Sequence, residues 1–343
     1  MKKSLLVIKF GTSAITNPNG EPDGEVIARI AKEMAELHQK HHLVLVSSGA
    51  VGAGKNFIED YDGSIAKRKA AAAVGNPLLI VQFSQAFAQY GIRVAQSLCE
   101  RRHFAKRNLF LQLKSTYQAL WENGIVPIAN ENDVISDREL KFSDNDELAT
   151  LIAAGFGAER LMIATESGGL LDKEKKLVPF VEHIDEKIME YVDTQKSGLG
   201  LGGMASKLTF AKLATQMGID VHVFGIKKGQ GGILSAYNHA SGTHFKAKYE
   251  NLTASKKWLA SGGLTTASLH LDEGAAQAIL ERKSLLAVGI RKVSGTFDKG
   301  EVLELLNAQG KVIAIGRSRV SSKDIQMQKQ NLIVAHANDI AVL

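Results

Sequence analysis

The sequence is almost free of cysteine, and this scarcity excludes two kinds of chemistry. Cys99 is the only cysteine among the 343 residues. No intramolecular disulfide and no cysteine-based metal site can therefore form. The residue ends an apolar run at positions 94–99, which favours a packed core thiol over a reactive nucleophile.

Other common signatures are missing as well. No apolar stretch approaches the ~20 residues of a membrane span, and no signal-peptide pattern precedes the apolar run at residues 4–10. The ten histidines do not follow a spacing typical of metal ligands. No G-x-S-x-G elbow supports a hydrolase triad. We therefore expect a cytoplasmic protein with no membrane segment, and neither the histidines nor the cysteine predict metal-ligand residues.

Positive charge is present in modest excess and is unevenly distributed. The net charge is +6, and residues 252–343 carry 12 Lys and Arg against 8 Asp and Glu, or +4 of that total. Such an excess fits either a nucleic-acid surface or a solvated basic face. Aromatic residues make up only 6% of the chain, and no arginine-rich run occurs, so RNA binding has little support from composition.

The first 250 residues have the pattern of an α/β domain. Continuous apolar runs alternate there with helical patterns, and the runs predict strands at 5–10, 43–47, 93–96, 125–129, 161–165 and 221–224. Such runs are typical of strands buried on both faces of a parallel sheet. We predict a doubly wound, mainly parallel sheet sandwiched by helices at residues 1–250. Its site should lie at the carboxyl ends of the strands.

The pattern changes after a polar segment at residues 240–258, which predicts a linker. One helix is predicted at 273–282, and strands are predicted at 284–288, 301–306, 311–316, 332–336 and 340–343. Turns containing glycine separate several of these strands. The pattern indicates a small β-rich domain at residues 258–343, in the form of a partly closed barrel.

Two lysines in glycine-rich surroundings stand out in the first domain. Lys9 ends an apolar strand and enters the small-residue turn 11–13, while Lys207 follows the glycine-rich segment 198–203. That segment spells G-x-G-x-x-G without a preceding strand, so it predicts a phosphate-wrapping loop, or else a plain surface loop, but no dinucleotide fold. Two cations suit phosphoryl transfer, which depends mainly on positioning and charge neutralisation.

A second glycine-rich turn follows the predicted strand at 43–47. Residues 49–55 match the first part of a P-loop, but Asn56 stands where a P-loop has Ser or Thr. We interpret this segment as a strand-to-helix turn whose backbone N–H groups face a carboxylate or phosphate. Ser48 is the polar side chain beside that turn.

Acidic and amide residues gather in two further places. The run 130–133 follows a predicted strand, and Asp144, Asn145 and Asp146 open a predicted helix. One of these residues could be a helix N-cap, but a cap does not explain three polar residues in a row. The carboxylates could orient the lysines, hold Mg²⁺ or receive a substrate ammonium group.

Taken in order, these segments resemble the amino acid kinase family, and the carboxy-terminal part resembles the PUA domain that bacterial members append. The resemblance rests on motifs at 7–13, 47–51, 130–133, 144–146 and 202–207, and at 288–290 and 295–302 in the last domain. It implies ATP-dependent, Mg²⁺-assisted phosphorylation of the γ-carboxylate of L-glutamate, the first step of proline biosynthesis. It also implies a homo-oligomer and feedback inhibition by proline. Another kinase of this fold, or an RNA-binding role of the last domain, is the alternative.

The resemblance also implies residue roles. The lysines would neutralise the transferring phosphoryl group and Asp146 would orient them, with Asp144 beside it, so the catalytic residues would be Lys9, Lys207 and Asp146. Glutamate would be held by Ser48, Asp133 and Asn145. The nucleotide would contact Lys9, Thr165, Glu166, Leu201, Gly202, Gly203, Met204, Ala205, Ser206 and Lys207. Three positions depart from the family pattern. Glu166 replaces an aspartate, and Leu201 and Ser206 stand where threonine is frequent, although Ser206 keeps a hydroxyl group.

Overall fold

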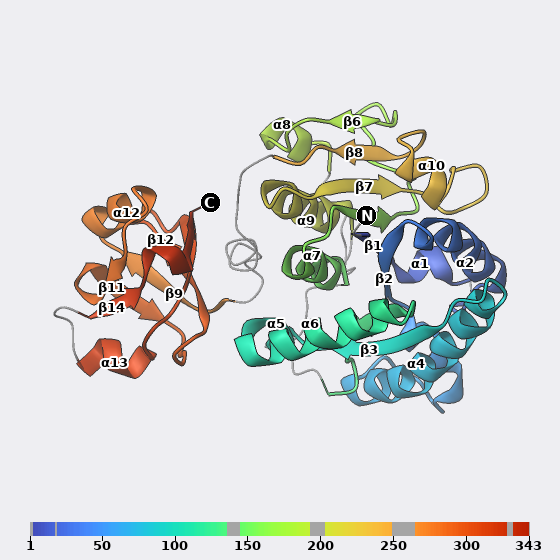
Figure 1. Ribbon diagram of the computed structural model, residues 1–343, viewed down its shortest axis with the longest axis horizontal. Helices are drawn as coiled ribbons and strands as arrows, with labels where there is room; N and C mark the ends of the chain where they lie inside the picture. The colour runs from blue at the N-terminus through green and yellow to red at the C-terminus, as the bar shows by residue number, and fades with distance from the viewer. Residues whose placement is uncertain are drawn as a thin grey trace. The chain divides into compact units, whose positions relative to one another are not determined.

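The computed structural model describes residues 3–17, 19–135, 145–192, 203–248, 265–327 and 332–342. The chain divides into two compact units. The first comprises Met1–Glu100 and Lys114–Tyr249, and the second comprises Arg101–Leu113 and Glu250–Leu343. Figure 1 shows both units, with many of their elements labelled.

The first unit is built on an eight-stranded sheet of order β3-β4-β2-β1-β5-β7-β8-β6 (Figure 1). Every neighbouring pair is parallel except β7 and β8, which are antiparallel. The strands are β1 (Ser4–Phe10), β2 (His41–Ser47), β3 (Val94–Cys99), β4 (Val126–Glu131), β5 (Arg160–Ala164), β6 (Phe180–Val181), β7 (Asp220–Phe224) and β8 (Thr243–Phe245). The prediction of a mainly parallel sheet is confirmed.

Helices cover both faces of this sheet. One face packs its apolar side chains against α2, α3, α4 and α10, and the other packs against α7 and α9. The helices of this unit are α1 (Thr12–Ile15), α2 (Gly24–His38), α3 (Ala50–Gly54), α4 (Ile65–Ala88), α7 (Asn145–Phe156), α8 (Glu186–Met189), α9 (Met204–Gln216) and α10 (Ile233–Tyr237), with a 3₁₀ turn η1 (Lys55–Phe57). Helix α5 (Arg101–Ala105) belongs to the second unit, and α6 (Arg107–Glu122) has its start in the second unit and its remainder in the first. This double cover explains the continuous apolar runs of the central strands.

Helix α4 is the one helix in the described part of the chain that is long and apolar enough to cross a membrane, judged by length and composition. Its side chains Ala71, Leu79 and Phe83 are buried in the first unit, and it packs against α2 and α3. A core helix of a soluble protein passes the same test, and the packing of α4 is that of a core helix.

The short strand β8 corrects the predicted linker at 240–258. Residues 243–245 pair with β7 and β6 in the sheet, and Thr243 is fully buried. The Thr243 hydroxyl accepts a hydrogen bond from the Leu170 amide at 2.8 Å. The polar sequence did not predict this strand, because the strand is stabilised by cross-strand pairing rather than by an apolar pattern. Residues 249–264 lie outside the described part of the chain.

The second unit contains the predicted β-rich domain. Its larger sheet has the order β11-β9-β12-β13-β15, and β10 pairs with β14 in a smaller sheet. The elements are β9 (Thr265–Leu271), α12 (Glu273–Leu280), β10 (Leu285–Leu286), η2 (Ala287–Gly289), β11 (Ile290–Ser294), β12 (Val302–Leu306), β13 (Val312–Arg317), α13 (Ser322–Met327), β14 (Ile333–Ala335), η3 (Ala337–Asp339) and β15 (Ile340–Val342). These strands surround an apolar core of their own.

Several boundaries in this unit differ from the sequence-based expectation. Strands β9 and β11 were not predicted, because their apolar residues are interrupted by Ser, His, Arg and Lys. Asp272 caps α12 by accepting a hydrogen bond from the Ala275 amide at 2.7 Å. The predicted strand at 284–288 is shorter than expected, because the chain turns into η2 after Leu286.

Candidate active site

The candidate active site begins with Lys9, near the end of β1. Side chains alternate across a strand, so Leu6, Ile8 and Phe10 enter the core on one face of the sheet and Lys9 projects from the other. That second face is covered by α7. A Cβ atom placed on Gly11 would lie 3.7 Å from Lys9 Nζ, so the ammonium group adjoins the small-residue turn that follows the strand.

Asp146 joins the two lysines that the sequence singles out. Lys9 Nζ lies 2.5 Å from Asp146 Oδ1, and Lys207 Nζ lies 3.0 Å from Asp146 Oδ2. Asp146 stands in the first turn of α7 and Lys207 in the first turn of α9. The exposed fractions are 3% for Lys9, 0% for Asp146 and 6% for Lys207.

This arrangement sets two lysine side chains against one carboxylate. Buried charges are costly unless they are paired, and here one carboxylate pairs with both cations. Each oxygen of Asp146 faces a lysine, which is the geometry expected of a carboxylate that orients two ammonium groups. Lysines held in this way suit an anionic ligand such as a phosphate.

A chain of amides supports the neighbouring residue Asn145. Its Nδ2 lies 2.8 Å from Ser48 Oγ, 2.9 Å from Asn130 Oδ1 and 3.3 Å from the Ser47 carbonyl oxygen. Asn130 in turn donates to Asn76 Oδ1 at 3.0 Å. The network therefore fixes the loop after β2, the end of β4 and the start of α7 to one another.

Two atoms of this network are buried without a hydrogen-bond partner among the described residues. They are Asn145 Oδ1 and Asn76 Nδ2. A cavity of about 10 Å³ lies beside Asn76 and Asn130, which is room for about one water molecule. Unsatisfied buried polar atoms are rare, so Asn145 Oδ1 is a candidate acceptor for a ligand donor.

The structure brings together five of the predicted site residues: Lys9, Ser48, Asn145, Asp146 and Lys207. The others that it describes lie on adjoining segments. Asp133 is half-buried two residues after β4, and Thr165 and Glu166 follow β5, while Gly203, Met204, Ala205 and Ser206 begin α9. Asp144, Leu201 and Gly202 lie outside the described residues.

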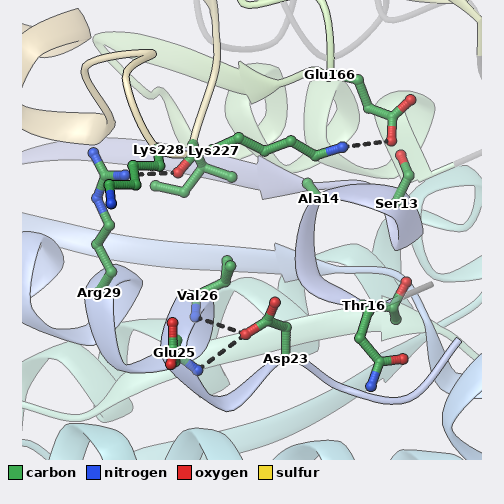
Figure 2. A pocket seen from close by; sticks show the side chains of 12 residues that line it. Ser13, Ala14, Thr16, Asp23, Glu25, Val26, Arg29, Glu166, Lys227 and Lys228 are labelled. Carbon is green, nitrogen blue, oxygen red and sulfur yellow. Dashed lines mark hydrogen bonds and ion pairs between the residues drawn. The ribbon is translucent and has the colours of Figure 1, made fainter. Parts of the chain in front are cut away.

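A polar pocket of about 700 Å³ opens next to the turn after β1 (Figure 2). Ser13, Thr16, Arg29, Glu166 and Lys227 are among the residues that line it. Lys227 extends toward Glu166, and its Nζ lies 3.0 Å from Glu166 Oε1. The volume falls within the range of small-molecule sites. The Glu166 carboxylate thus forms an ion pair at the pocket wall.

The P-loop-like run at residues 49–55 makes a turn at its first glycine, and its last glycine allows two helices to pack closely. Gly49, at φ +99°, makes the turn into α3. A Cβ on Gly54 would lie 1.9 Å from the Ala71 carbonyl oxygen, so this glycine allows α3 to touch α4. The Lys55 side chain lies against Gly20.

Sequence reasoning missed Asn76 and gave Asn130 no role. Asn130 stood in a polar run whose position after a strand was a usable signal. Asn76 offered a weaker signal, since it is a single amide inside the alanine-rich helix α4 and is followed by Pro77. A buried polar residue in a helix interior requires a partner, and only the fold shows that the partner is Asn130.

Comparison with known proteins agrees with the geometry of the site. The model of the amino acid kinase family matches residues 4–225. This chain belongs to the amino acid kinase family. The model of the PUA domain matches residues 267–335, so this amino acid kinase carries a PUA domain, and the resemblance seen in the sequence is confirmed.

Curated relatives match this amino acid kinase over most of its length. It is 36% identical over 331 residues to the glutamate 5-kinase of Vibrio vulnificus (strain YJ016), covering 93% of this chain and 87% of that protein. It is also 36% identical over 343 residues to the glutamate 5-kinase of Haemophilus influenzae (strain PittGG), covering 96% and 92%. The chain is thus an enzyme of the kinase class.

A solved structure supports the fold. The carbamate kinase from Giardia lamblia bound to AMP-PNP superposes with a TM-score of 0.50 at 19% identity, covering 72% of this chain and 99% of that chain. At this identity the likeness concerns the fold alone. It agrees with the mainly parallel sheet and its two helical layers.

Proposed function

We propose that this enzyme transfers the γ-phosphoryl group of ATP to the γ-carboxylate of L-glutamate, giving L-glutamyl 5-phosphate and ADP, as the first step of proline biosynthesis. The observation that carries the proposal is the pair of lysines, Lys9 and Lys207, held on one buried carboxylate. The similarity to glutamate 5-kinases over most of the chain supports the choice of acceptor.

The acceptor needs no general base in this reaction. A glutamate carboxylate has an ordinary pKa of about 4.3, so it is ionised near neutral pH. A carboxylate oxygen attacks the γ-phosphorus, the bond from that phosphorus to the β,γ-bridging oxygen breaks, and ADP leaves with the electron pair. The main barrier is the repulsion between two anions, which the enzyme must bring together.

Lys9 and Lys207 would lower this barrier by neutralising negative charge on the transferring group. Asp146 would keep both ammonium groups in place before the substrate arrives, which is electrostatic preorganisation. Mg²⁺ would enter with ATP as part of the substrate complex. Both oxygens of Asp146 already face lysines, so the phosphate oxygens are the better ligands for the ion.

Glutamate would bind between Ser48, Asp133 and Asn145. The Asp133 carboxylate suits the α-ammonium group of the substrate, and the buried Asn145 Oδ1 offers a second acceptor. The Asn145 amide is held by Ser48 and Asn130. An Asn145 side chain that is held rigidly would fix the position of the γ-carboxylate for attack.

The nucleotide would lie along the pocket beside Glu166 and along the start of α9. Glu166 lines this pocket, Thr165 precedes Glu166 in the chain, and Gly203 to Lys207 form the start of α9. Leu201 and Gly202 would complete the proposed contacts. Backbone N–H groups in the first turn of a helix such as α9 suit phosphate oxygens. Because Glu166 is paired with Lys227, we expect its side chain to shape the pocket wall.

The test is ADP release by the purified protein with Mg-ATP, with and without L-glutamate, and with hydroxylamine to trap an acyl phosphate. Glutamate-dependent ADP release with an equal yield of hydroxamate is expected. Aspartate, N-acetylglutamate, carbamate and UMP serve as competing acceptors. Turnover only with one of these would reassign Ser48, Asp133 and Asn145. No turnover with any acceptor, from folded protein that binds ATP, would overturn the proposal.

The resemblance supports three further parts of this proposal. The enzyme would act in the cytoplasm as a homo-oligomer, and proline would inhibit it by competing with glutamate. Light scattering during size-exclusion chromatography measures the oligomer, and a rise in the apparent KM for glutamate with added proline tests the inhibition. We also propose domain boundaries at 1–250 and 258–343, which limited proteolysis between them can test.

A further inference from the structure

Three histidines lie close together in the first unit, although their spacing in the sequence is not typical of metal ligands. His222 of β7 lies directly opposite His244 of β8 in the antiparallel register, and His239 follows α10. One ring nitrogen of each lies within 4.8 Å of the other two. No other group of this kind occurs among the described residues.

Two of the nitrogens already have nearly the separation that one metal ion requires. His222 Nε2 and His239 Nδ1 are 3.0 Å apart. Two imidazole nitrogens bound to one tetrahedral Zn²⁺ at 2.0–2.1 Å are roughly 3.3 Å apart. A metal ion could therefore replace the hydrogen bond between these rings with only a small shift of either side chain.

The third ring must turn before it can join them. The rings of His222 and His244 stack with centroids 4.4 Å apart and an interplanar angle of 6°. Imidazole lone pairs lie in the ring plane, so two parallel rings cannot both point at one ion. The side chain of His244 is 16% exposed, and rotation about its side-chain torsions would bring its free edge toward the other two.

Asp220 supplies the outer partner that a metal-binding histidine needs. Its Oδ1 lies 3.2 Å from His244 Nε2 and also accepts a hydrogen bond from the Ala247 amide at 2.9 Å. A proton on Nε2 leaves the Nδ1 lone pair of His244 for the metal.

One cation near the cluster, the Arg160 guanidinium, opposes a bound metal ion. It donates to the Tyr237 carbonyl oxygen at 2.7 Å and lies over the Tyr237 ring, so it is held on Tyr237 rather than on the histidines.

We propose that His222, His239 and His244 bind one divalent transition-metal ion of the zinc class, with Asp220 orienting His244. His239 is exposed and gives the ion a path from solvent, whereas His222 is 1% exposed. The ion would link β7, β8 and the connection between them, so its role is structural. Asp220 opens β7, whereas Lys9, Asn130 and Ser48 lie at or just beyond the ends of β1, β4 and β2, so the two sites are separate.

The test uses the full-length protein after removal of metal with a chelator. Titration with Co²⁺ should produce the ligand-field absorption of a low-coordination nitrogen site, and Zn²⁺ measured against a chromophoric chelator should bind one ion per chain. Zn²⁺ should also raise the melting temperature, because it binds the folded state.

Two substitutions make the test specific. His239→Asn should weaken zinc binding by at least about 100-fold, because even changes to outer-shell partners cost ~10–100-fold. Asp220→Asn should weaken it by ~10–100-fold. His183→Asn, at an exposed histidine outside the cluster, should bind zinc like the wild type. Glutamate-dependent ADP release by His239→Asn in zinc-free buffer should match the wild type, which shows that the variant is folded.

Three results would overturn the proposal. They are an equal zinc affinity of His239→Asn and the wild type, the absence of stoichiometric binding to the wild type, and a zinc-dependent rise in melting temperature that persists in His239→Asn. The exposed His239 is chosen because replacement of the buried His222 could unfold the protein for reasons unrelated to metal.

Discussion

Asp146 holds Lys9 and Lys207 with the two oxygens of one carboxylate, at 2.5 Å and 3.0 Å. The three side chains come from a strand and from the first turns of two helices, α7 and α9. Two ammonium groups so close together would repel each other without the carboxylate. Their relative position therefore depends on Asp146, and the kinetic predictions begin there.

Lys207→Ala should mainly lower kcat, because the contact of Lys207 strengthens as charge develops in the transition state. We expect a loss of about 100- to 1000-fold, as for removal of one charge-stabilising donor. Steady-state kinetics with L-glutamate and Mg-ATP measure it. Lys212→Ala, on the same helix α9, is the control and should be near wild type. An unchanged kcat in Lys207→Ala would remove this residue from the chemistry.

Asp133→Ala should raise the KM for glutamate and leave the KM for ATP nearly unchanged. A hydrogen bond to a charged group contributes about 1.5–3 kcal/mol, so we expect a rise of roughly 10- to 100-fold. The two KM values are measured separately, each at saturation of the other substrate. Equal effects on both substrates would remove Asp133 from the glutamate site.

Asn76→Ala should also raise the KM for glutamate, by about 10-fold. The substitution removes the acceptor of Asn130 and leaves a buried amide unsatisfied, which costs about 1–3 kcal/mol. Asn130 then holds Asn145 less firmly. Asn123→Ala, at an exposed amide, is the matched control. A variant that is less stable but has an unchanged KM would show that Asn76 is only structural.

Gly54→Ala should destabilise the first unit strongly. The new Cβ would lie 1.9 Å from the Ala71 carbonyl oxygen, and backbone cannot move aside as a flexible side chain can. Overpacking typically costs about 1–3 kcal/mol, and we expect the upper end or more from urea unfolding. Gly24→Ala, where nothing lies within 4 Å, should leave stability unchanged or raise it slightly. Equal stability of the two variants would contradict the packing argument.

Cys99 should react with thiol reagents far more slowly in the folded protein than in the unfolded chain. Burial raises its pKa from 9.0 to about 11, which alone lowers the thiolate fraction at pH 8 by about 100-fold. Because the folded state holds this proton more tightly, its contribution to stability is complete below pH 9 and is lost as the pH rises toward 11. Rapid labelling of folded protein at pH 8 would contradict this burial.

Much of the fold could be predicted because its signals are local. The apolar runs of β1 and β2, the helical spacing of α2 and the change of pattern near residue 250 depend on neighbouring residues only. Short strands such as β6 and β8 carry no such signal, because pairing partners rather than propensity stabilise them.

The sequence by itself determined which residue types are available to the site: two lysines in glycine-rich surroundings and a cluster of carboxylates and amides. Only the tertiary structure decided that Asp146 pairs with both lysines and that Asn76 supports Asn145 through Asn130. It also decided that three histidines lie close together. Lys9 and Asp146 are well over a hundred residues apart in the chain, and such contacts depend on strand order and helix packing. Those are set by burial of the whole core, which no local pattern encodes.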